Sequence, residues 1–324
     1  MAETTNISQM AELLSKELFE EFLWEQSGPM NINWPCIKEE HEAKTHPSDV
    51  VFSYLEPYAD IRTYLNCDLK SYAKGTINKG SVRTAIESLG NAIQCAEISE
   101  DWQKLYKVHD ENFDIHGLLF IFNHDGEYDK EFAEILRQAT AETRSLPKGK
   151  RIYVLGPFDI CYLSSVVNDI KRLRGDGKLL ATTKHRFYYP DLINRKVVRS
   201  GLGYAATLEM LTSPIQVIKY DSPKGGTGLL IYYRESGRTI DEFLYLIDYL
   251  FHYQQLQENI SIDICLPFPD KNASSLLESA KKEYLVKANE DEALSQRMEI
   301  IHYRPVINVV KEFHPYEIGM RYEK

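Results

Sequence analysis

An acid and a lysine stand two positions apart in "YLNCDLKSYAKG" (64–75), where an apolar run ends. In a β-strand, Asp68 and Lys70 would point to the same face of the sheet. A second acid, Asp49, occurs in "THPSDVVF" (45–52), nineteen positions before Asp68. Two carboxylates held close together are difficult to keep ionised without a cation. Mg²⁺ and Mn²⁺ prefer such oxygen ligands, and Mg²⁺ commonly binds substrate phosphates as well.

The chemistry that fits these residue types is hydrolysis of a phosphodiester bond. A divalent cation would polarise the phosphate, and the ammonium group of Lys70 would orient the nucleophile or offset charge in the transition state. A third acid could come from the preceding helix. Glu21 is the first choice and Glu17 the second, because the two lie four residues apart on one helix face.

The elements that must position these residues follow from hydrophobic periodicity. Residues 8–26 have apolar side chains at helical spacing, with Ser8 as a candidate N-cap. The segments 49–58 and 61–72 are rich in β-branched and aromatic residues and predict a hairpin, which would bring Asp49 and Asp68 together. The chain then predicts a helix, a buried strand and another helix, at 80–97, 116–122 and 129–142.

This order of elements and motifs resembles the PD-(D/E)XK nuclease superfamily. The resemblance covers residues 8–142 and implies an α/β fold with a restriction-endonuclease-like mixed sheet flanked by helices. It also implies that Asp49 and Asp68 bind the divalent metal and that Lys70 acts in catalysis. One departure is that Ser48 separates the acid from the proline of the usual Pro-Asp pair.

The resemblance implies further site residues on the helices: Glu21 or Glu17 as a metal-binding acid, and Gln94 on the helix after the motif. Each has an ordinary structural alternative. An Asp-x-Lys pair at a strand end is commonly a solvated edge that discourages strand pairing, and helix glutamates are commonly surface charge. The chain also resembles stand-alone bacterial nucleases of anti-phage defence operons.

Composition excludes several classes of protein. Of the 324 residues, 43% are hydrophobic and 27% charged, which predicts a folded globular chain. The longest apolar runs are too short to cross a bilayer. Five scattered cysteines without a CxxC pair indicate a reduced, cytoplasmic protein. A net charge of −10 argues against indiscriminate coating of nucleic acid, although a local basic groove remains compatible with it.

Basic residues that could contact DNA occur in two places. One group follows the motif and leads into the next helix, whose first N–H groups could bind a phosphate: Lys74, Lys79 and Arg83. The other lies in the aromatic-rich "KHRFYYP" (184–190), where stacking and phosphate contacts could combine: Lys184 and Arg186. The alternative for both groups is ordinary solubilising charge.

Residues that could act as soft metal ligands occur shortly before Asp49. Cys36, His41 and His46 could suggest zinc. Because only three such ligands are near one another in sequence and no paired spacing is present, we do not expect structural zinc.

The domain boundary is expected near "SLPKGK" (145–150), where proline, glycine and charges interrupt the pattern. This gives a nuclease-like domain at 1–147 and an α/β or α+β domain at 148–324. The second domain would recognise DNA, a partner protein or a second copy of the chain. The alternative to a DNA-cleaving enzyme is a catalytically silent nucleic-acid-binding or assembly subunit of a defence complex.

Overall fold

The computed structural model describes most of the chain as two compact units, one within residues 1–161 and the other within 162–309. The described residues are 2–108, 112–141, 143, 149–179, 185–190, 204–223, 226–253, 255–256, 260–287 and 292–308. Within these segments, no helix combines the length and the apolar character needed to span a membrane.

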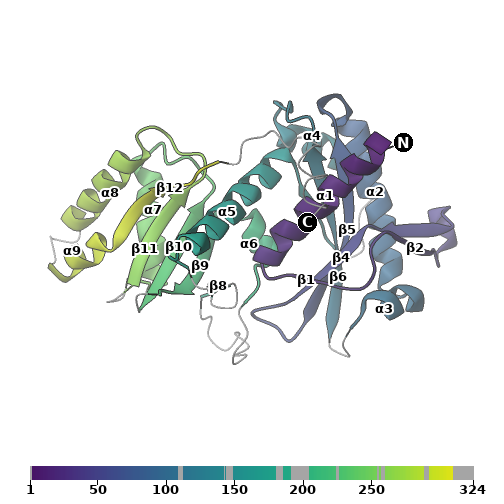
Figure 1. The fold of residues 1–324 in the computed structure, drawn as a ribbon, viewed down its shortest axis with the longest axis horizontal. Helices are drawn as coiled ribbons and strands as arrows, with labels where there is room; N and C mark the ends of the chain where they lie inside the picture. Colours follow the sequence, from purple (N-terminus) through teal and green to yellow (C-terminus); the bar gives the residue numbers. More distant parts are fainter. Residues whose placement is uncertain are drawn as a thin grey trace. The chain divides into compact units, whose positions relative to one another are not determined.

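The first unit is a five-stranded mixed sheet with helices on both faces (Figure 1). Its main elements are α1 (Ala2–Glu21), β1 (Glu25–Gln26), β4 (Val50–Leu55), β5 (Arg62–Tyr72), α2 (Lys79–Ala96), α3 (Glu100–Tyr106), β6 (Phe113–Asn123), α4 (Phe132–Thr140) and β7 (Ile152–Leu155). The strand order is β1-β4-β5-β6-β7. β1, β4 and β5 pair antiparallel, whereas β5, β6 and β7 pair parallel. The expected hairpin is therefore present, and the mixed sheet is confirmed.

The core of the first unit has two layers, one on each side of the sheet. On one face, Phe19 of α1 packs edge-on against Phe52 and Phe120, which alternate with residues of the other face. On the other face, α2 packs over Val51 and Leu119 in a separate buried cluster. Alternation along the strands thus assigns odd-numbered β4 and even-numbered β5 residues to the α2 face.

Two expectations about element boundaries are corrected. The helix expected at 8–26 ends at Glu21, because Leu23 takes a left-handed φ of 64° and Trp24 turns back to stack on Phe19 at 4.4 Å. The strand β7 pairs with β6 and belongs to the first sheet. The division expected at 147/148 had placed it in the second domain.

A small antiparallel hairpin leads into β4. It consists of β2 (Ile32–Pro35) and β3 (Thr45–Ser48), with a short 3-10 turn, η1 (Glu39–His41), between them. The hairpin packs on the side of the sheet covered by α2, where Trp34 belongs to the same buried cluster. The Trp34 indole N–H donates to the hydroxyl of Ser48 at 3.0 Å. The hairpin therefore sets the direction from which the chain enters β4.

The second unit has the same order of strand directions as the first. Its elements are α5 (Pro157–Gly175), β8 (His185–Phe187), α6 (Leu208–Thr212), β9 (Ile215–Asp221), β10 (Thr227–Tyr233), α7 (Ile240–His252), β11 (Ile260–Leu266), α8 (Ala273–Lys287), α9 (Glu292–Glu299) and β12 (Ile301–Pro305). The sheet order is β12-β11-β10-β9-β8. β8, β9 and β10 are antiparallel, and β10, β11 and β12 are parallel. The expected second α/β domain is thus confirmed.

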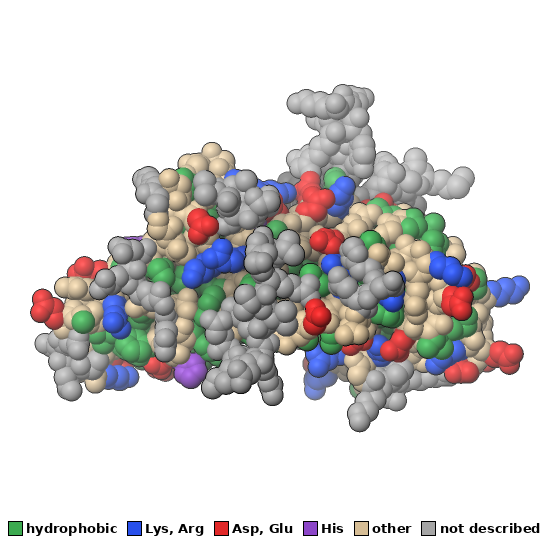
Figure 2. Space-filling view, turned by 90° about the horizontal axis from the view of Figure 1, so that it is seen from below, with side chains coloured by type: hydrophobic (Ala, Val, Ile, Leu, Met, Phe, Trp, Pro, Cys, Tyr) green, Lys and Arg blue, Asp and Glu red, His purple; other side chains and the backbone are tan. Residues whose placement is uncertain are grey.

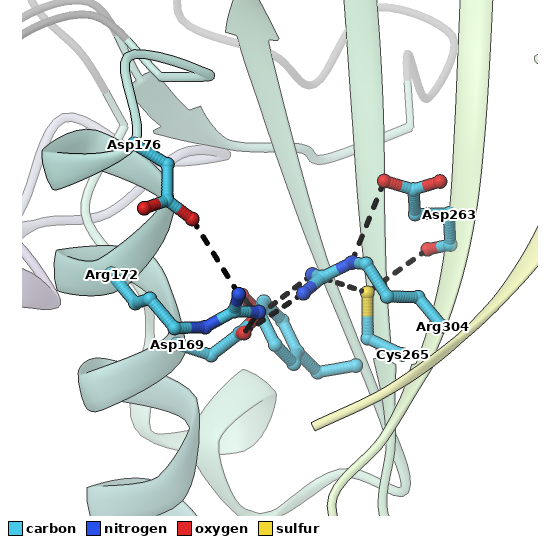
Figure 3. A network of polar contacts seen from close by, with 7 residues as sticks. Asp169, Arg172, Asp176, Asp263, Cys265 and Arg304 are labelled. Carbon is cyan, nitrogen blue, oxygen red and sulfur yellow. Dashed lines mark hydrogen bonds and ion pairs between the residues drawn. The ribbon is translucent and has the colours of Figure 1, made fainter. Parts of the chain in front are cut away.

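A buried polar network ties α5 to the second sheet (Figure 3). Asp169 of α5 is 2% exposed and accepts hydrogen bonds from Arg304 of β12, Arg172 and the Tyr232 hydroxyl, each at 2.8 Å. Arg304 also contacts the sulfur of Cys265 at 2.9 Å. Burial alone would raise the pKa of Asp169, but its hydrogen bonds and the charge of Arg304 outweigh burial and lower that pKa. Because its charges compensate one another, we interpret the network as structural.

Candidate active site

The two acids of the motif face one another across β4 and β5. Val51 pairs with Asn66 in the ladder, and both lie on the α2 face. Asp68 lies two residues after Asn66 in β5, and Asp49 lies two residues before Val51, directly ahead of β4, so the two acids share that face. The backbone N–H of Leu69 donates to the Asp49 carboxylate at 2.7 Å. The sheet itself therefore brings together the acids that are nineteen positions apart in sequence.

Lys70 lies beside this pair. Its ammonium nitrogen is 2.6 Å from Oδ1 of Asp68, and the Asp68 residue is 8% exposed. Burial raises the pKa of Asp68 to about 6. Lys70 opposes that rise, and the charge and hydrogen bond of Asp49 add to it. Lys70 alone therefore does not fully compensate the negative charges of Asp49 and Asp68.

The lysine stays charged in this setting. Burial by itself would lower the pKa of Lys70, but the carboxylates of Asp68 and then Asp49 outweigh it, and the pKa is raised. A protonated amine beside two acids is a hydrogen-bond donor and a positive charge, which suits a developing negative charge on phosphate oxygens. It does not suit a general base at neutral pH.

The donor set fits a hard divalent cation. The charge of Asp49 helps to raise the pKa of Asp68, so a cation between the two carboxylates would relieve their repulsion. Mg²⁺ and Mn²⁺ prefer oxygen ligands of this kind. The groups that contact these carboxylates are the Leu69 N–H and the Lys70 ammonium, which donate hydrogen bonds and cannot bind a metal ion themselves. Asp49 and Asp68 are therefore the residues that would hold the ion.

The acid of α1 that lies toward Asp49 is Glu12. Asn31 links them, because its backbone N–H donates to the Asp49 carbonyl at 2.8 Å and its side-chain amide donates to Glu12 at 3.0 Å. Asn31 takes a φ of 56°, a left-handed conformation that asparagine tolerates better than most residues. Glu12 was missed in the sequence, although it stands seven positions before the buried Phe19 and so on the same helix face.

The glutamates proposed from the sequence lie further along α1. Glu21 is the last residue of the helix, next to Trp24, which stacks on Tyr54 at the end of β4 remote from Asp49. Nine residues of helix, about 14 Å at 1.5 Å per residue, separate it from Glu12. Glu17 lies one turn before Glu21. Glu12 is therefore the acid of α1 that Asn31 links to the Asp49 backbone, although α1 packs on the sheet face opposite to that of the two acids.

These positions predict different effects for three similar substitutions. We expect Glu12→Gln to reduce the hydrolytic activity of this site by about 10–100-fold, the usual loss when a group supporting a metal ligand is removed. Glu21→Gln and Glu17→Gln should each stay within about threefold of the wild type, since both lie further along α1 than Glu12 and away from Asp49. Cleavage rates at saturating Mg²⁺ measure the difference. A larger loss in Glu21→Gln than in Glu12→Gln would reverse the assignment.

The structure does not bring Gln94 to the acids. Leu89 of α2 lies against Gly117, which pairs with Asn66 of β5. Because α2 runs back along the sheet after β5 ends, Gln94 lies toward the start of β5, whereas Asp68 lies toward its end. Gln94 instead lines a pocket formed by α2, α4 and β7.

The lysine and arginine residues that follow the motif are largely engaged within the protein. Lys74 pairs with Asp129 at 2.8 Å, and Arg83 lies 3.8 Å from Glu87. Lys79 is the half-buried first residue of α2. The start of α2 is also closed to a phosphate, because the Asn78 side chain accepts the N–H groups of Gly80 and Ser81.

The second pair of basic residues lies in the other unit. Arg186 is in β8, opposite Lys219 of β9, where two cations stand side by side on one sheet edge. Lys184 falls outside the described residues. The proposed DNA contact in this region therefore stays a prediction.

The second sheet does not repeat the acidic pair. On β9 and β10 the described side chains that face α7 belong to its apolar core: Ile215, Val217, Leu229, Ile231 and Tyr233. Val217 pairs with Ile231 and Ile215 with Tyr233, as Val51 pairs with Asn66 in the first sheet. The same topology therefore carries oxygen ligands in one unit and hydrophobic packing in the other.

The fold and site of the first unit define a PD-(D/E)XK nuclease domain: a mixed sheet between helices, with an acid on one strand facing Asp-x-Lys on the next. Residues 1–159 match the family model described as the GAPS4 protein PD-(D/E)XK nuclease domain, so this part of the chain belongs to that superfamily. A comparison with curated proteins finds no match. The resemblance expected from the sequence is confirmed.

Proposed function

We propose that the first unit is a divalent-metal-dependent nuclease that hydrolyses DNA phosphodiester bonds. The observation that carries the proposal is the facing pair of Asp49 and Asp68, with the Lys70 ammonium nitrogen 2.6 Å from Asp68, in the mixed sheet of a nuclease fold. Nuclease domains of this superfamily typically use divalent metals, and the oxygen donors here favour Mg²⁺ or Mn²⁺.

The residues of the site have distinct roles in this proposal. Asp49 and Asp68 hold the cation, and the Leu69 N–H fixes the orientation of Asp49. When bound, the ion supplies positive charge that polarises the phosphate and acidifies water. Lys70 donates hydrogen bonds to the phosphate oxygens as negative charge develops on them.

We assign the second unit to recognition or assembly. Its described core positions are apolar where the first unit has acids, which argues against a second hydrolytic centre of the same kind. On the face drawn in Figure 2, basic side chains are interspersed with acidic ones. With a net charge of −10, DNA contact should depend on local groups, on a partner protein or on a second copy of the chain. The name of the matched family and the resemblance to defence nucleases support a role in bacterial anti-phage defence.

The test is cleavage of plasmid DNA, linear DNA and RNA of the same sequence, with Mg²⁺, Mn²⁺ or EDTA. We expect DNA to be cut with metal and left intact in EDTA. Lys70→Ala should reduce the rate on the order of 10²–10³-fold, because it removes a charge that stabilises the transition state. Lys104→Ala is the matched control, an exposed lysine of α3 paired with Glu100.

The rival function predicts a different pattern. A silent nucleic-acid-binding subunit would bind DNA equally in EDTA and would not hydrolyse it with any metal. Equal cutting by the wild type and Lys70→Ala would remove the assignment of the site. Cleavage of RNA with DNA left intact would support nuclease activity but would show that DNA is not the substrate.

A further inference from the structure

Four soft ligand atoms from separate segments of the first unit converge at one point. Cys36 follows β2, His41 ends η1, His46 lies in β3 and Cys95 lies in α2. One ligand atom from each lies within 4.8 Å of the other three. The sequence had suggested only three of them, because Cys95 comes from a helix 49 positions after His46.

The spacing of these atoms is that of ligands around one ion. The two sulfurs are 3.8 Å apart, His41 Nδ1 is 3.6 Å from Cys36 Sγ and 3.4 Å from Cys95 Sγ, and the two ring nitrogens are 3.4 Å apart. A tetrahedron with Zn–S bonds of about 2.3 Å and Zn–N bonds of about 2.0 Å has edges of about 3.8, 3.5 and 3.3 Å respectively.

Other interactions do not account for the arrangement. Two sulfurs at 3.8 Å are too far apart for a disulfide, whose bond is about 2.05 Å. Hydrogen bonding is also insufficient, since His41 Nδ1 lies within reach of Cys36, Cys95 and His46 at once. A ring nitrogen has either one proton or one lone pair, so it can serve only one such partner well.

We propose that Cys36, His41, His46 and Cys95 bind a structural Zn²⁺ ion. Two sulfurs and two imidazoles in a closed tetrahedral set select zinc, whereas the oxygen pair of the nuclease site selects a harder cation. Backbone groups of Ile37 and Lys38 hydrogen-bond to the Cys95 sulfur and would fix its orientation as a ligand.

The ion has a definite structural task. It joins the β2–β3 hairpin and η1 to α2, and this hairpin runs directly into β4. His46 stands three positions before Asp49, and the intervening Ser48 hydroxyl donates to Asn66 of β5. The Trp34 ring lies 5.1 Å from that of His46. The zinc site thereby holds the segment that places Asp49 opposite Asp68.

The test is the metal content of the 324-residue chain, purified without a histidine tag and without chelator. We expect about one zinc per chain, as for structural sites whose binding is coupled to folding. After replacement by Co²⁺, the protein should show intense visible absorption of a tetrahedral ion and thiolate-to-cobalt charge transfer. Wild-type protein that contains no zinc and takes up neither Zn²⁺ nor Co²⁺ would overturn the proposal.

Variants locate the ion. Cys95→Ser and Cys36→Ser should lose zinc and the charge-transfer band, whereas Cys161→Ser, at a half-buried cysteine outside the cluster, should retain both. Asp68→Asn should also retain zinc, which separates this site from the nuclease site. Full zinc content in both Cys95→Ser and Cys36→Ser would place the metal elsewhere. The wild-type measurement stands even if these variants fold poorly.

Discussion

Replacing Asp68 with asparagine should abolish cleavage and at the same time stabilise the metal-free protein. We expect activity to fall on the order of 10³-fold, because a charged group aimed at the reacting centre is lost. The buried carboxylate has a pKa of about 6 instead of 3.8, a difference of roughly 2 units or about 3 kcal/mol when it is ionised. An asparagine side chain cannot ionise, so at pH 8 the Asp68→Asn variant should be more stable by up to that amount.

The same shift predicts how stability depends on pH. Because the folded pKa is raised above the unfolded value, the stabilising effect of protonated Asp68 is complete below about pH 4 and is lost as pH rises through about 6. In EDTA, the wild type should therefore lose stability between pH 5 and pH 8 more steeply than Asp68→Asn. Denaturant unfolding at the two pH values measures this. Parallel pH profiles would show that Asp68 is not buried as described.

Metal binding should raise the stability of the wild type at pH 8 but not that of Asp68→Asn. A ligand that binds the folded state raises its unfolding free energy by mass action, so Mg²⁺ at pH 8 should stabilise the wild type and leave Asp68→Asn nearly unchanged. Asp101→Asn, an exposed acid of α3, is the matched control and should follow the wild type in activity and stability.

Replacing Arg304 with methionine should destabilise the second unit by about 3–5 kcal/mol, the usual result of leaving a buried charge without its partner. Arg304 reaches both oxygens of Asp169, at 2.8 Å and 2.7 Å, inside the network that joins α5 to β10, β11 and β12. Denaturant unfolding of the full chain measures the loss. Arg297→Met, at an exposed position of α9, is the control and should stay within about 0.5 kcal/mol of the wild type.

A second substitution distinguishes loss of the buried Arg304–Asp169 ion pair from loss of the packing contacts of the Arg304 side chain. With Asp169→Leu added to Arg304→Met, the buried carboxylate that Arg304→Met leaves without its arginine is removed as well, and part of the stability should return. If the double variant lost at least the sum of the single losses, the network would not act as a coupled pair. Nuclease activity measured below the unfolding transition should change little, since these residues lie in the other unit.

The sequence by itself determined the elements and the central motif. Periodicity located most helices and strands, and the two-residue spacing of Asp68 and Lys70 placed both on one face of β5. The hairpin between Asp49 and Asp68 could be predicted because it is a local connection, and its pairing follows from alternation along two neighbouring strands.

Only the tertiary structure decided which helix residues lie near that motif. Spacing in the sequence does not determine which turn of a helix packs beside a given residue of the sheet. Packing places Glu21 and Gln94 away from the two acids. Asn31, by contrast, links Glu12 to the Asp49 backbone. Tertiary packing likewise places Cys95 of α2 beside Cys36, His41 and His46. Ligands from separate elements meet only when the chain is folded, because long-range packing and not local spacing sets their distances.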